Sequence, residues 1–468
     1  MKIANPADHR RRSLAACIAA LLPLGANAAV TTCNDNTTGF DTLRHAILVA
    51  NPGDTVDASG LTCHTITLAA GPLAIAVANL TIKGPGSGAL TIDAHHASQV
   101  FLDSQTGTTL TLQQLTIANG TITGDMALGG CMYSKADLEL DDVTVTGCSA
   151  VGVSQAVGGG LVAASKLTMT NSRITGNSVL VTTGVVDNAS TFGGGFFAYS
   201  LTMNGSVVSG NYLHSPLAKV YGGGGIVRDV STITTSTFTN NIAAAAGTDE
   251  NFSYGGAIVS LSTLNITGST FDNNTADGGG GIFIHDADGT AAISIIRNTT
   301  ISGNTANYGA GGITTNAKLQ MQNSTVAFNT AAGLIGSGGL LFEGTVLKIG
   351  STIIADNTST GEGAGDLTVT GTPTMAIVKS LIKTANVTLP LTTIILDPVL
   401  GPLQNNGGPT RTHAIGPGSP AVDAGADAAG LNFDQRGVPY LRISGPAPDI
   451  GAFEYQDTIF ASGFEPQF

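Results

Sequence analysis

A motif about thirty residues long recurs along the chain and limits the possible folds more than any other feature. In each copy, a strand-like stretch ends in a pair of residues of which the second is asparagine. The first residue of the pair is small in most copies. Successive asparagines are 34, 30, 33, 30, 25 and 28 residues apart. A repeat of this length is typical of a solenoid, in which each turn packs only on its neighbours. The seven copies are Gly176-Asn177, Gly210-Asn211, Asn240-Asn241, Asn273-Asn274, Gly303-Asn304, Phe328-Asn329 and Asp356-Asn357.

Glycine runs form a second landmark, which alternates with the first. Between the landmarks lie short runs of alternating apolar and polar residues, such as 167–170 and 319–322. This alternation indicates strands rather than helices. We therefore predict an all-β fold in which residues 61–400 form a single parallel β-helix. The glycine runs are Gly129-Gly130, Gly158–Gly160, Gly193–Gly195, Gly222–Gly225, Gly255-Gly256, Gly278–Gly281, Gly311-Gly312 and Gly338-Gly339.

Stacking explains why these residue types recur. Neighbouring coils lie about 4.8 Å apart, so equivalent side chains touch, and about ten coils make a rod roughly 50 Å long. Asparagines at equivalent turns can then hydrogen-bond along the stack, and glycine permits positive φ at tight corners. A β-sandwich or a propeller is the alternative. Propeller blades, however, need about 40 residues and usually carry aromatic or Trp-Asp signatures, which this chain lacks.

The charge balance restricts the partners. The chain has 32 acidic and 19 basic residues, and its formal net charge is −13. This balance argues against nucleic acid or an anionic membrane surface as the main partner. The sequence does not indicate an oligomeric state.

Residues 1–28 have the pattern of a cleaved signal peptide. Arginines precede an apolar stretch from Leu14 to Leu24, and Ala26 and Ala28 fit a cleavage site. Lipidation of Cys17 is the alternative, but the arginines stand too close to it for a full apolar region. We predict export to the cell surface, the outer membrane or the medium. We expect no transmembrane segment in the mature chain.

Four cysteines remain after residue 28, an even number that suggests disulfides in an exported protein. Three connectivities are possible, of which Cys33–Cys63 with Cys131–Cys148 joins the nearest neighbours. Each bond would contribute about 3 kcal/mol through loop entropy. Four buried free thiols are the alternative.

Residues 29–60 are predicted to form an N-terminal cap that contains one short helix, within residues 40–53. Asp41 is the expected N-cap, and the Asn-Pro-Gly at 51–53 ends the helix. Leu43, Ala46, Ile47 and Ala50 fall on one face, suited to covering the first coil.

This N-terminal segment resembles the CSLREA-type motif at the start of exported β-helix proteins. It is a variant, since Thr42 and His45 stand where serine and an acid are usual. The resemblance continues through residues 54–57, 63–68 and 80–86, and it favours the Cys33–Cys63 pairing.

Two coils resemble the repeats of polymorphic outer membrane proteins. Gly255-Gly-Ala-Ile258 matches GGA[ILV], and residues 238–241 and 271–274 match FxxN. The other coils are degenerate. The resemblance implies a right-handed parallel β-helix on a bacterial surface.

Residues 401–456 are similar to the choice-of-anchor Q domain, through motifs at 401–410, 418–425, 434–437 and 449–454. We expect a turn-rich C-terminal cap, followed by a sorting or anchor-like tail over residues 457–468. Its charged residues suit turn-capping carboxylates around one arginine. They are Asp423, Asp434, Arg436, Asp449 and Glu454.

The loop between the asparagine and the next glycine run is long in three successive coils, at 178–192, 212–221 and 242–254. Insertions at one point of successive coils emerge on the same side, where they often form a binding face. Tolerated surface insertions are the alternative. The predicted ligand-binding residues are Tyr212, His214, Lys219, Tyr221, Asp249, Glu250, Phe252 and Tyr254.

We identify no catalytic or cofactor-binding residues. Asp286 and Asp288 form a weak candidate for a calcium turn, without the later acids of an EF-hand loop. The sequence therefore favours a non-enzymatic, adhesin-like or structural surface protein that binds an extracellular glycan or a cell-surface protein. The alternative is a β-helix polysaccharide lyase or glycoside hydrolase, which would need acids aligned on adjacent coils.

Overall fold

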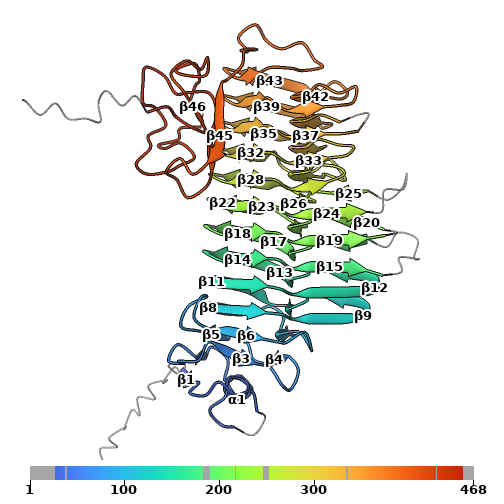
Figure 1. The fold of residues 1–468 in the computed structure, drawn as a ribbon, viewed down its shortest axis with the longest axis vertical. Coiled ribbons are helices and arrows are strands. Elements are labelled where there is room, and N and C mark those ends of the chain that lie inside the picture. Colours follow the sequence, from blue (N-terminus) through green and yellow to red (C-terminus); the bar gives the residue numbers. More distant parts are fainter. Residues whose placement is uncertain are drawn as a thin grey trace, which may run out of the picture.

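The computed structural model describes residues 27–36, 39–182, 190–216, 218–245, 252–333, 336–427 and 429–456. Over these residues the chain winds into a parallel β-solenoid of about 11 turns (Figure 1). The predicted all-β fold with a single parallel β-helix is confirmed. The predicted signal peptide, except residues 27 and 28, and the predicted tail at 457–468 lie outside the described residues.

Three walls enclose the main core. The first wall follows the glycine corners, and its strands pair in parallel from one end of the rod to the other. It contains β4 (Leu73–Ile75), β7 (Phe101–Asp103), β10 (Met132–Ser134), the starts of β13 (Leu161–Thr170) and β17 (Phe196–Asn204), β21 (Gly225–Val227), β26 (Ile258–Ser260), β30 (Ile282–Ile284), β34 (Ile313–Thr315), β38 (Leu340–Phe342) and β42 (Leu367–Val369).

The second wall continues from the first after a bend. It begins where β1 (Asn27–Ala29) pairs with β2 (Thr55–Asp57). It continues through β5 (Thr81–Lys83), the starts of β8 (Thr109–Ala118) and β11 (Asp137–Thr146), the ends of β13 and β17, β22 (Ser231–Thr234), β27 (Leu264–Thr267), β31 (Ser294–Arg297), β35 (Leu319–Gln322), β39 (Val346–Gly350) and β43 (Thr374–Val378).

The third wall leads to the asparagine landmark. It contains β3 (Thr65–Thr67), β6 (Thr91–Asp93), the ends of β8 and β11, β14 (Arg173–Thr175), β18 (Val207–Ser209), β23 (Thr237–Thr239), β28 (Thr270–Asp272), β32 (Thr300–Ser302), β36 (Thr325–Ala327), β40 (Ile353–Ala355) and β44 (Leu381–Ile382).

A separate sheet leaves the coils beyond the asparagines. One branch contains β9 (Thr121–Leu128), β12 (Ser149–Val157), β15 (Ser178–Val181), β19 (Tyr212–Ser215), β24 (Ile242–Ala245), β29 (Thr275–Ala276), β33 (Thr305–Ala306), β37 (Thr330–Ala331) and β41 (Thr358–Ser359). The other branch starts from the end of β12 and contains β16 (Ser190–Phe192), β20 (Lys219–Tyr221) and β25 (Ser253–Tyr254).

The asparagine landmarks form one continuous ladder, as predicted. Each buried side-chain amide donates to the Oδ1 of the next asparagine, at 2.9–3.0 Å. The ladder ends at Asp366, whose Oδ1 accepts from the amide of Asn357 at 3.0 Å. At the other end, the backbone N–H of Cys148 donates to Asn177 at 3.0 Å. Because each rung satisfies polar groups that water cannot reach, the ladder holds successive turns in register.

A second ladder of hydroxyl groups was not predicted. Its side chains lie at the bend between the second and third walls, and each accepts from the backbone N–H of the residue one coil earlier. Serine and threonine are common everywhere in this chain, so the spacing of these few does not stand out. The accepting residues are Ser172, Ser206, Ser236, Ser269, Thr299, Ser324 and Ser380.

The N-terminal end of the rod is covered by α1 (Leu43–Val49), which is seven residues long (Figure 1). Leu43, Ala46 and Ile47 are buried against the core, as predicted. The predicted N-cap is wrong by one residue. The hydroxyl of Thr42 accepts from the N–H of His45 at 3.1 Å, and the carbonyl of Asp41 instead accepts from Thr31. No helix among the described residues is long and apolar enough to cross a membrane.

Both nearest-neighbour disulfides are present, Cys33–Cys63 and Cys131–Cys148. The first joins the N-terminal cap to an early coil, where both cysteines pack against the core. The second lies at the start of the asparagine ladder, since Cys148 occupies the rung position before Asn177.

Residues 400–456, here called the C-terminal segment, do not cover the end of the rod as expected of a cap. They lie along the third wall, beside β28 to β40 (Figure 1). Ile415, Ala421 and Ile450 pack on outward apolar residues of β40 and β44. The open end is instead covered by Ala385, Val387 and Leu389, which pack on the main core. The segment packs on this wall because the wall presents apolar and hydroxyl side chains on its outer face, which the segment contacts and hydrogen-bonds.

Candidate functional site

The long loops predicted from the sequence stack on one side of the rod, as expected. They form the separate sheet with its two branches, here called the side lobe (Figure 1). Leu213 on β19 and Val220 on β20 point between the branches and contribute to a small core of their own. Earlier coils join the lobe through β9 and β12, which the loop lengths did not reveal. The lobe is therefore a packed structure with two outer faces.

The two faces separate the predicted binding residues. Side chains alternate along a strand, so Tyr212 and His214 point away from the core of the lobe on β19, and their rings stack at 5.9 Å. Lys219 and Tyr221 point away from it on β20, the opposite branch. Phe252 and Tyr254 share the side of Tyr221, whereas Asp249 and Glu250 lie outside the described residues. The structure thus brings only part of the predicted set together.

An aromatic stripe runs along the face that contains Tyr221. The chain has 16 phenylalanines and eight tyrosines in 468 residues, so seven rings on one surface are a marked concentration. The ring centroids of Phe192, Tyr221 and Tyr254 are 5.6 and 5.3 Å apart along three coils. The stripe consists of Phe192, Phe197, Tyr221, Phe252, Tyr254, Phe283 and Tyr308.

Within most of the stripe the rings stack on one another, so their faces are covered. At the lower end, the guanidinium of Arg228 lies 5.9 Å from the Phe192 ring and 5.5 Å from the Phe197 ring. The corner after Tyr254 requires glycine, since a Cβ at Gly255, where φ is +63°, would lie 2.5 Å from the carbonyl oxygen of Ile258.

The stack ends above Tyr254, where a groove of about 400 Å³ opens. The next residue in the column is Gly278, and a Cβ there would lie 3.1 Å from the Tyr254 ring. Around this opening the rings stand at large angles to each other. The planes of Phe252 and Tyr308 are 83° apart, with centroids separated by 5.0 Å, and Tyr254 and Phe283 are tilted by 42° at 4.7 Å. Partly exposed rings at different inclinations therefore line the groove.

Asp277 positions two sides of the groove. Its Oδ2 accepts from the N–H and hydroxyl of Ser253, at 2.9 and 2.8 Å, between the rings of Phe252 and Tyr254. Its Oδ1 accepts from the amide of Asn307 at 2.8 Å, and its carbonyl accepts from the N–H of Tyr308. With its side chain committed to these contacts, Asp277 is a positioning residue.

Glu343, which follows β38, brings a second carboxylate to the groove. Burial raises its pKa, and the charge of His285 opposes this shift. The pKa of Tyr254 is raised by burial and then by the charges of Asp277 and Glu343. The groove therefore has a negative potential when its acids are ionised.

In the weak metal candidate, both carboxylates accept hydrogen bonds within their own turn. Asp286 accepts from the N–H of Ala291 at 3.1 Å, and Asp288 accepts from Thr290. In the part of the chain that the structure describes, no three His, Cys, Asp or Glu side chains are grouped to hold a metal ion.

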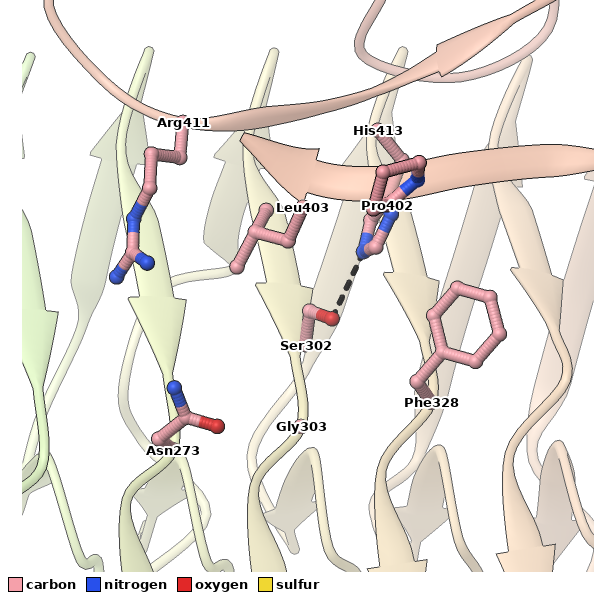
Figure 2. A pocket seen from close by; sticks show the side chains of 8 residues that line it. All are labelled: Asn273, Ser302, Gly303, Phe328, Pro402, Leu403, Arg411 and His413. Carbon is pink, nitrogen blue, oxygen red and sulfur yellow. Dashed lines mark hydrogen bonds between the residues drawn. The ribbon is translucent and has the colours of Figure 1, made fainter. Parts of the chain in front are cut away.

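A second hollow lies between the C-terminal segment and the third wall, with a volume of about 350 Å³ (Figure 2). Here β45 (Leu400–Gln404) pairs antiparallel with β46 (Thr412–Ile415). The Nδ1 of His413 is 2.7 Å from the carbonyl of Gly401, so it carries the proton, and Nε2 accepts from Ser302 at 2.8 Å. Both side chains are 3% exposed. This pair docks the segment on the wall, as Gln435 does through Thr300 at 2.6 Å.

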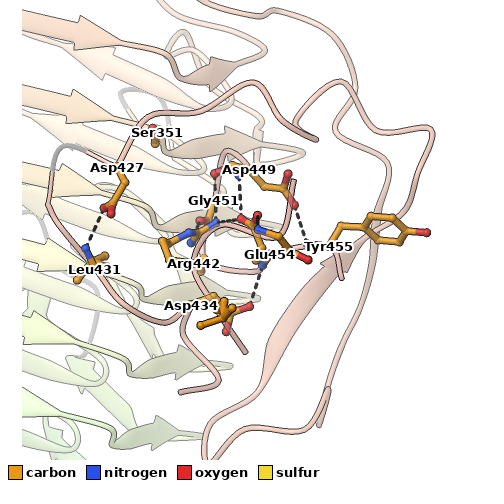
Figure 3. A network of polar contacts seen from close by, with 12 residues as sticks. Ser351, Asp427, Leu431, Asp434, Arg442, Asp449, Gly451, Glu454 and Tyr455 are labelled. Atoms are coloured by element: carbon orange, nitrogen blue, oxygen red, sulfur yellow. Dashed lines mark hydrogen bonds and ion pairs between the residues drawn. The ribbon is translucent and has the colours of Figure 1, made fainter. Parts of the chain in front are cut away.

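The charged residues of the C-terminal segment hold its turns together (Figure 3). The prediction of carboxylates around one arginine must be corrected, because there are two. Arg436 pairs with Asp434 at 2.6 Å, and Arg442 pairs with Glu454 at 2.7 Å. Glu454 also accepts from the backbone N–H groups of Ser444 and Asp449. Burial raises the pKa of Glu454 to about 7, against the opposing effect of Arg442.

Sequence reasoning missed Phe283, Tyr308 and Glu343, which complete the groove. They lie after the asparagine ladder or on the first wall, outside the long loops. An alignment of the coils could have revealed Phe283. It pairs with Val259 of the preceding coil, at a position of the first wall that points away from the main core.

Comparison with known proteins does not assign a family. No family model matches the chain, and no curated protein matches it. Among solved structures, the crystal structure of pectate lyase Pel9A is similar over 92% of this chain and 98% of its own, with a TM-score of 0.38 and 12% sequence identity. At this level of similarity we transfer nothing of the activity of Pel9A, and the function is inferred from the geometry of the chain itself.

Proposed function

We propose that this is an exported β-helix protein, at the cell surface or in the medium, that acts by binding an extracellular ligand rather than by catalysis. The observation that carries the proposal is the groove at the end of the aromatic stripe. Exposed rings with a few convergent polar groups are what ligand sites generally present. The N-terminal signal pattern and the two disulfides support export, since disulfides persist in oxidising compartments.

The proposal also rests on what the carboxylates of the groove do. Hydrolysis of a glycan needs two carboxyl groups that are free to act on opposite sides of a sugar bond. Asp277 is 7% exposed, and both of its oxygens accept hydrogen bonds from Ser253 or Asn307. Glu343 therefore has no available partner acid within the groove, which supports binding over hydrolysis.

The test of binding uses the secreted protein on arrays of extracellular glycans and on intact cells, with a parallel screen for glycan degradation. We expect retention without degradation, and we expect the Tyr254→Leu/Tyr308→Leu variant to lose at least about 90% of it. The control is Tyr212→Leu, which removes a ring of similar exposure from the opposite face of the lobe. Equal retention by the groove variant, or release of shortened glycans by the wild type, would reject the proposal.

The test of export is cell fractionation with sequencing of the mature N-terminus. We expect Ala29 as the first residue, and we expect deletion of residues 1–28 to leave the protein inside the cell. A deletion of residues 457–468 shows whether the tail retains the protein at the surface, since we propose an anchoring role for it.

A further inference from the structure

The walls of the groove suit a particular kind of ligand, because they are aromatic on several sides. Phe252, Tyr254, Phe283 and Tyr308 line it. Their planes differ by 42° to 83° in three neighbouring pairs, at centroid distances of 4.7 to 6.5 Å. Rings set at such angles do not offer one flat platform, and a rounded group in the groove can contact several of them at once. A planar ligand could stack on only one of them.

The carboxylates of the groove favour a ligand group that is positively charged. Glu343 contributes a carboxylate that receives no hydrogen bond or ion pair from any other described side chain. Asp277 adds a second negative charge behind Ser253. The facing titratable groups are His285, Tyr254 and Tyr308, and only His285 can become positive. An anion would be repelled, and an uncharged ligand would bury the Glu343 carboxylate without a counter-charge.

The same molecule already uses aromatic rings to hold cations in two other places. Arg228 covers Phe192 and Phe197 at the lower end of the stripe. Arg436 lies 3.8 Å from the ring centroids of both Tyr440 and Phe453 in the C-terminal segment. At the upper end, no lysine or arginine among the described residues covers the rings of the groove. A positive group from a ligand would complete the same arrangement there.

We propose that the groove binds an organic cation, specifically a trimethylammonium group such as the one that choline carries. Its methyl groups would contact the faces of Phe252, Tyr254, Phe283 and Tyr308, and its charge would be balanced by Glu343. Aromatic rings around a quaternary ammonium group attract it through their quadrupoles, most strongly when water is excluded. This inference rests on the proposed binding function and names the chemistry of the ligand.

The test measures binding of tetramethylammonium and choline to the full mature chain by calorimetry and by broadening of the methyl proton resonance. The comparison ligand is 3,3-dimethylbutanol, which has the shape of choline without its charge. We expect choline to bind at least about tenfold more tightly than this neutral analogue. The chain has no tryptophan, so quenching of tyrosine fluorescence gives an independent readout at Tyr254 and Tyr308.

Two variants separate the contributions. Glu343→Gln preserves size and removes the charge, so it should weaken choline about tenfold without weakening dimethylbutanol. Tyr308→Leu, at a side chain that is 51% exposed, should weaken both without affecting folding. Tyr212→Leu should change neither. Equal affinity for choline and the neutral analogue, or an unchanged choline affinity in Glu343→Gln, would overturn the proposal.

The outcome can be distinguished from failure of the proposed function. If cells or glycans are retained by the wild type and lost by Tyr254→Leu/Tyr308→Leu, while choline neither binds nor competes, binding through the groove holds and the cation inference is wrong. If choline binds and competes with the retained surface, both hold. Phosphatidylcholine vesicles and free choline, used as separate competitors, identify whether the group is recognised on a lipid or in solution.

Discussion

At the scale of single residues, Asn241 illustrates how the ladder holds the turns. Its side-chain amide donates to Asn274 at 2.9 Å and to the carbonyl of Val208 at 3.0 Å. Its Oδ1 accepts from the N–H and the amide of Asn211. The side chain is fully buried, so none of these partners can turn to water if Asn241 is lost.

Replacing Asn241 with alanine should lower the free energy of unfolding by about 3 kcal/mol, because several buried polar groups would lose a partner. Asn241→Asp should be at least as damaging, since a carboxylate accepts but cannot donate to Asn274. Urea unfolding measures both. A loss below about 1 kcal/mol in both variants would mean that the ladder adds little to stability.

The buried pair of Arg442 and Glu454 leads to a second expectation at this scale. Both side chains are at most 1% exposed. Glu454→Gln would leave the guanidinium buried without its charge partner, which typically costs about 3 to 5 kcal/mol. We expect faster proteolysis of the C-terminal segment in this variant. Asp427→Asn, which keeps the oxygen that accepts from Leu431, is the control and should leave the rate unchanged.

At the scale of elements, the side lobe and the docked C-terminal segment differ in how far the sequence predicts them. The lobe could be predicted because loop lengths are read directly from the spacing of two landmarks. The position of the C-terminal segment could not, because contacts such as Gln435 with Thr270 join residues 165 apart without any repeating pattern. The groove could be predicted only in part. Phe252 and Tyr254 belong to a long loop, whereas Tyr308 and Glu343 belong to other coils.

His413 makes this docking dependent on pH. Burial lowers its pKa from the ordinary 6.5, so between the lowered value and 6.5 the unfolded state binds a proton that the docked state does not. Stability therefore falls as pH decreases through this window. Glu454, whose pKa is raised to about 7, acts in the opposite direction over the same range, so the effect of His413 must be measured against a variant. Lowering the pH from about 7.5 to about 5.5 should accelerate proteolysis of the C-terminal segment more in the wild type than in His413→Gln. An equal acceleration in the two proteins would contradict a role for His413 in the pH dependence.

At the scale of the whole molecule, the rod is a sum of coils that each pack on the next. Its internal stacks, such as Phe238 on Phe271 at 5.0 Å, depend only on the coil before and the coil after. This is why the fold class could be predicted from local spacing, whereas spacing left three disulfide connectivities open. The N-cap at Thr42 was misplaced by one residue, because Asp41 is an equally good capping residue.

Deleting residues 178–211 removes one complete coil and should leave a folded protein. The deletion joins Asn177 to Tyr212, and Ser178 and Tyr212 are partners in the parent sheet. Stability should fall moderately, because one interface between coils is lost. Deleting only residues 178–195 shifts the register and should abolish folding. Circular dichroism and thermal unfolding measure both, and equal effects of the two deletions would contradict a modular rod.

Asp366, at the end of the asparagine ladder, gives the stack a direction. Every asparagine of the ladder donates one amide hydrogen to the next asparagine in the same direction along the rod. Asp366 receives the last of these with Oδ1, while its Oδ2 accepts from Thr384. An acidic residue can only stand last in such a relay. Spontaneous deamidation would turn an inner asparagine into an aspartate, which cannot donate to the next rung. We therefore expect ageing of this protein to interrupt the ladder at the deamidated turn.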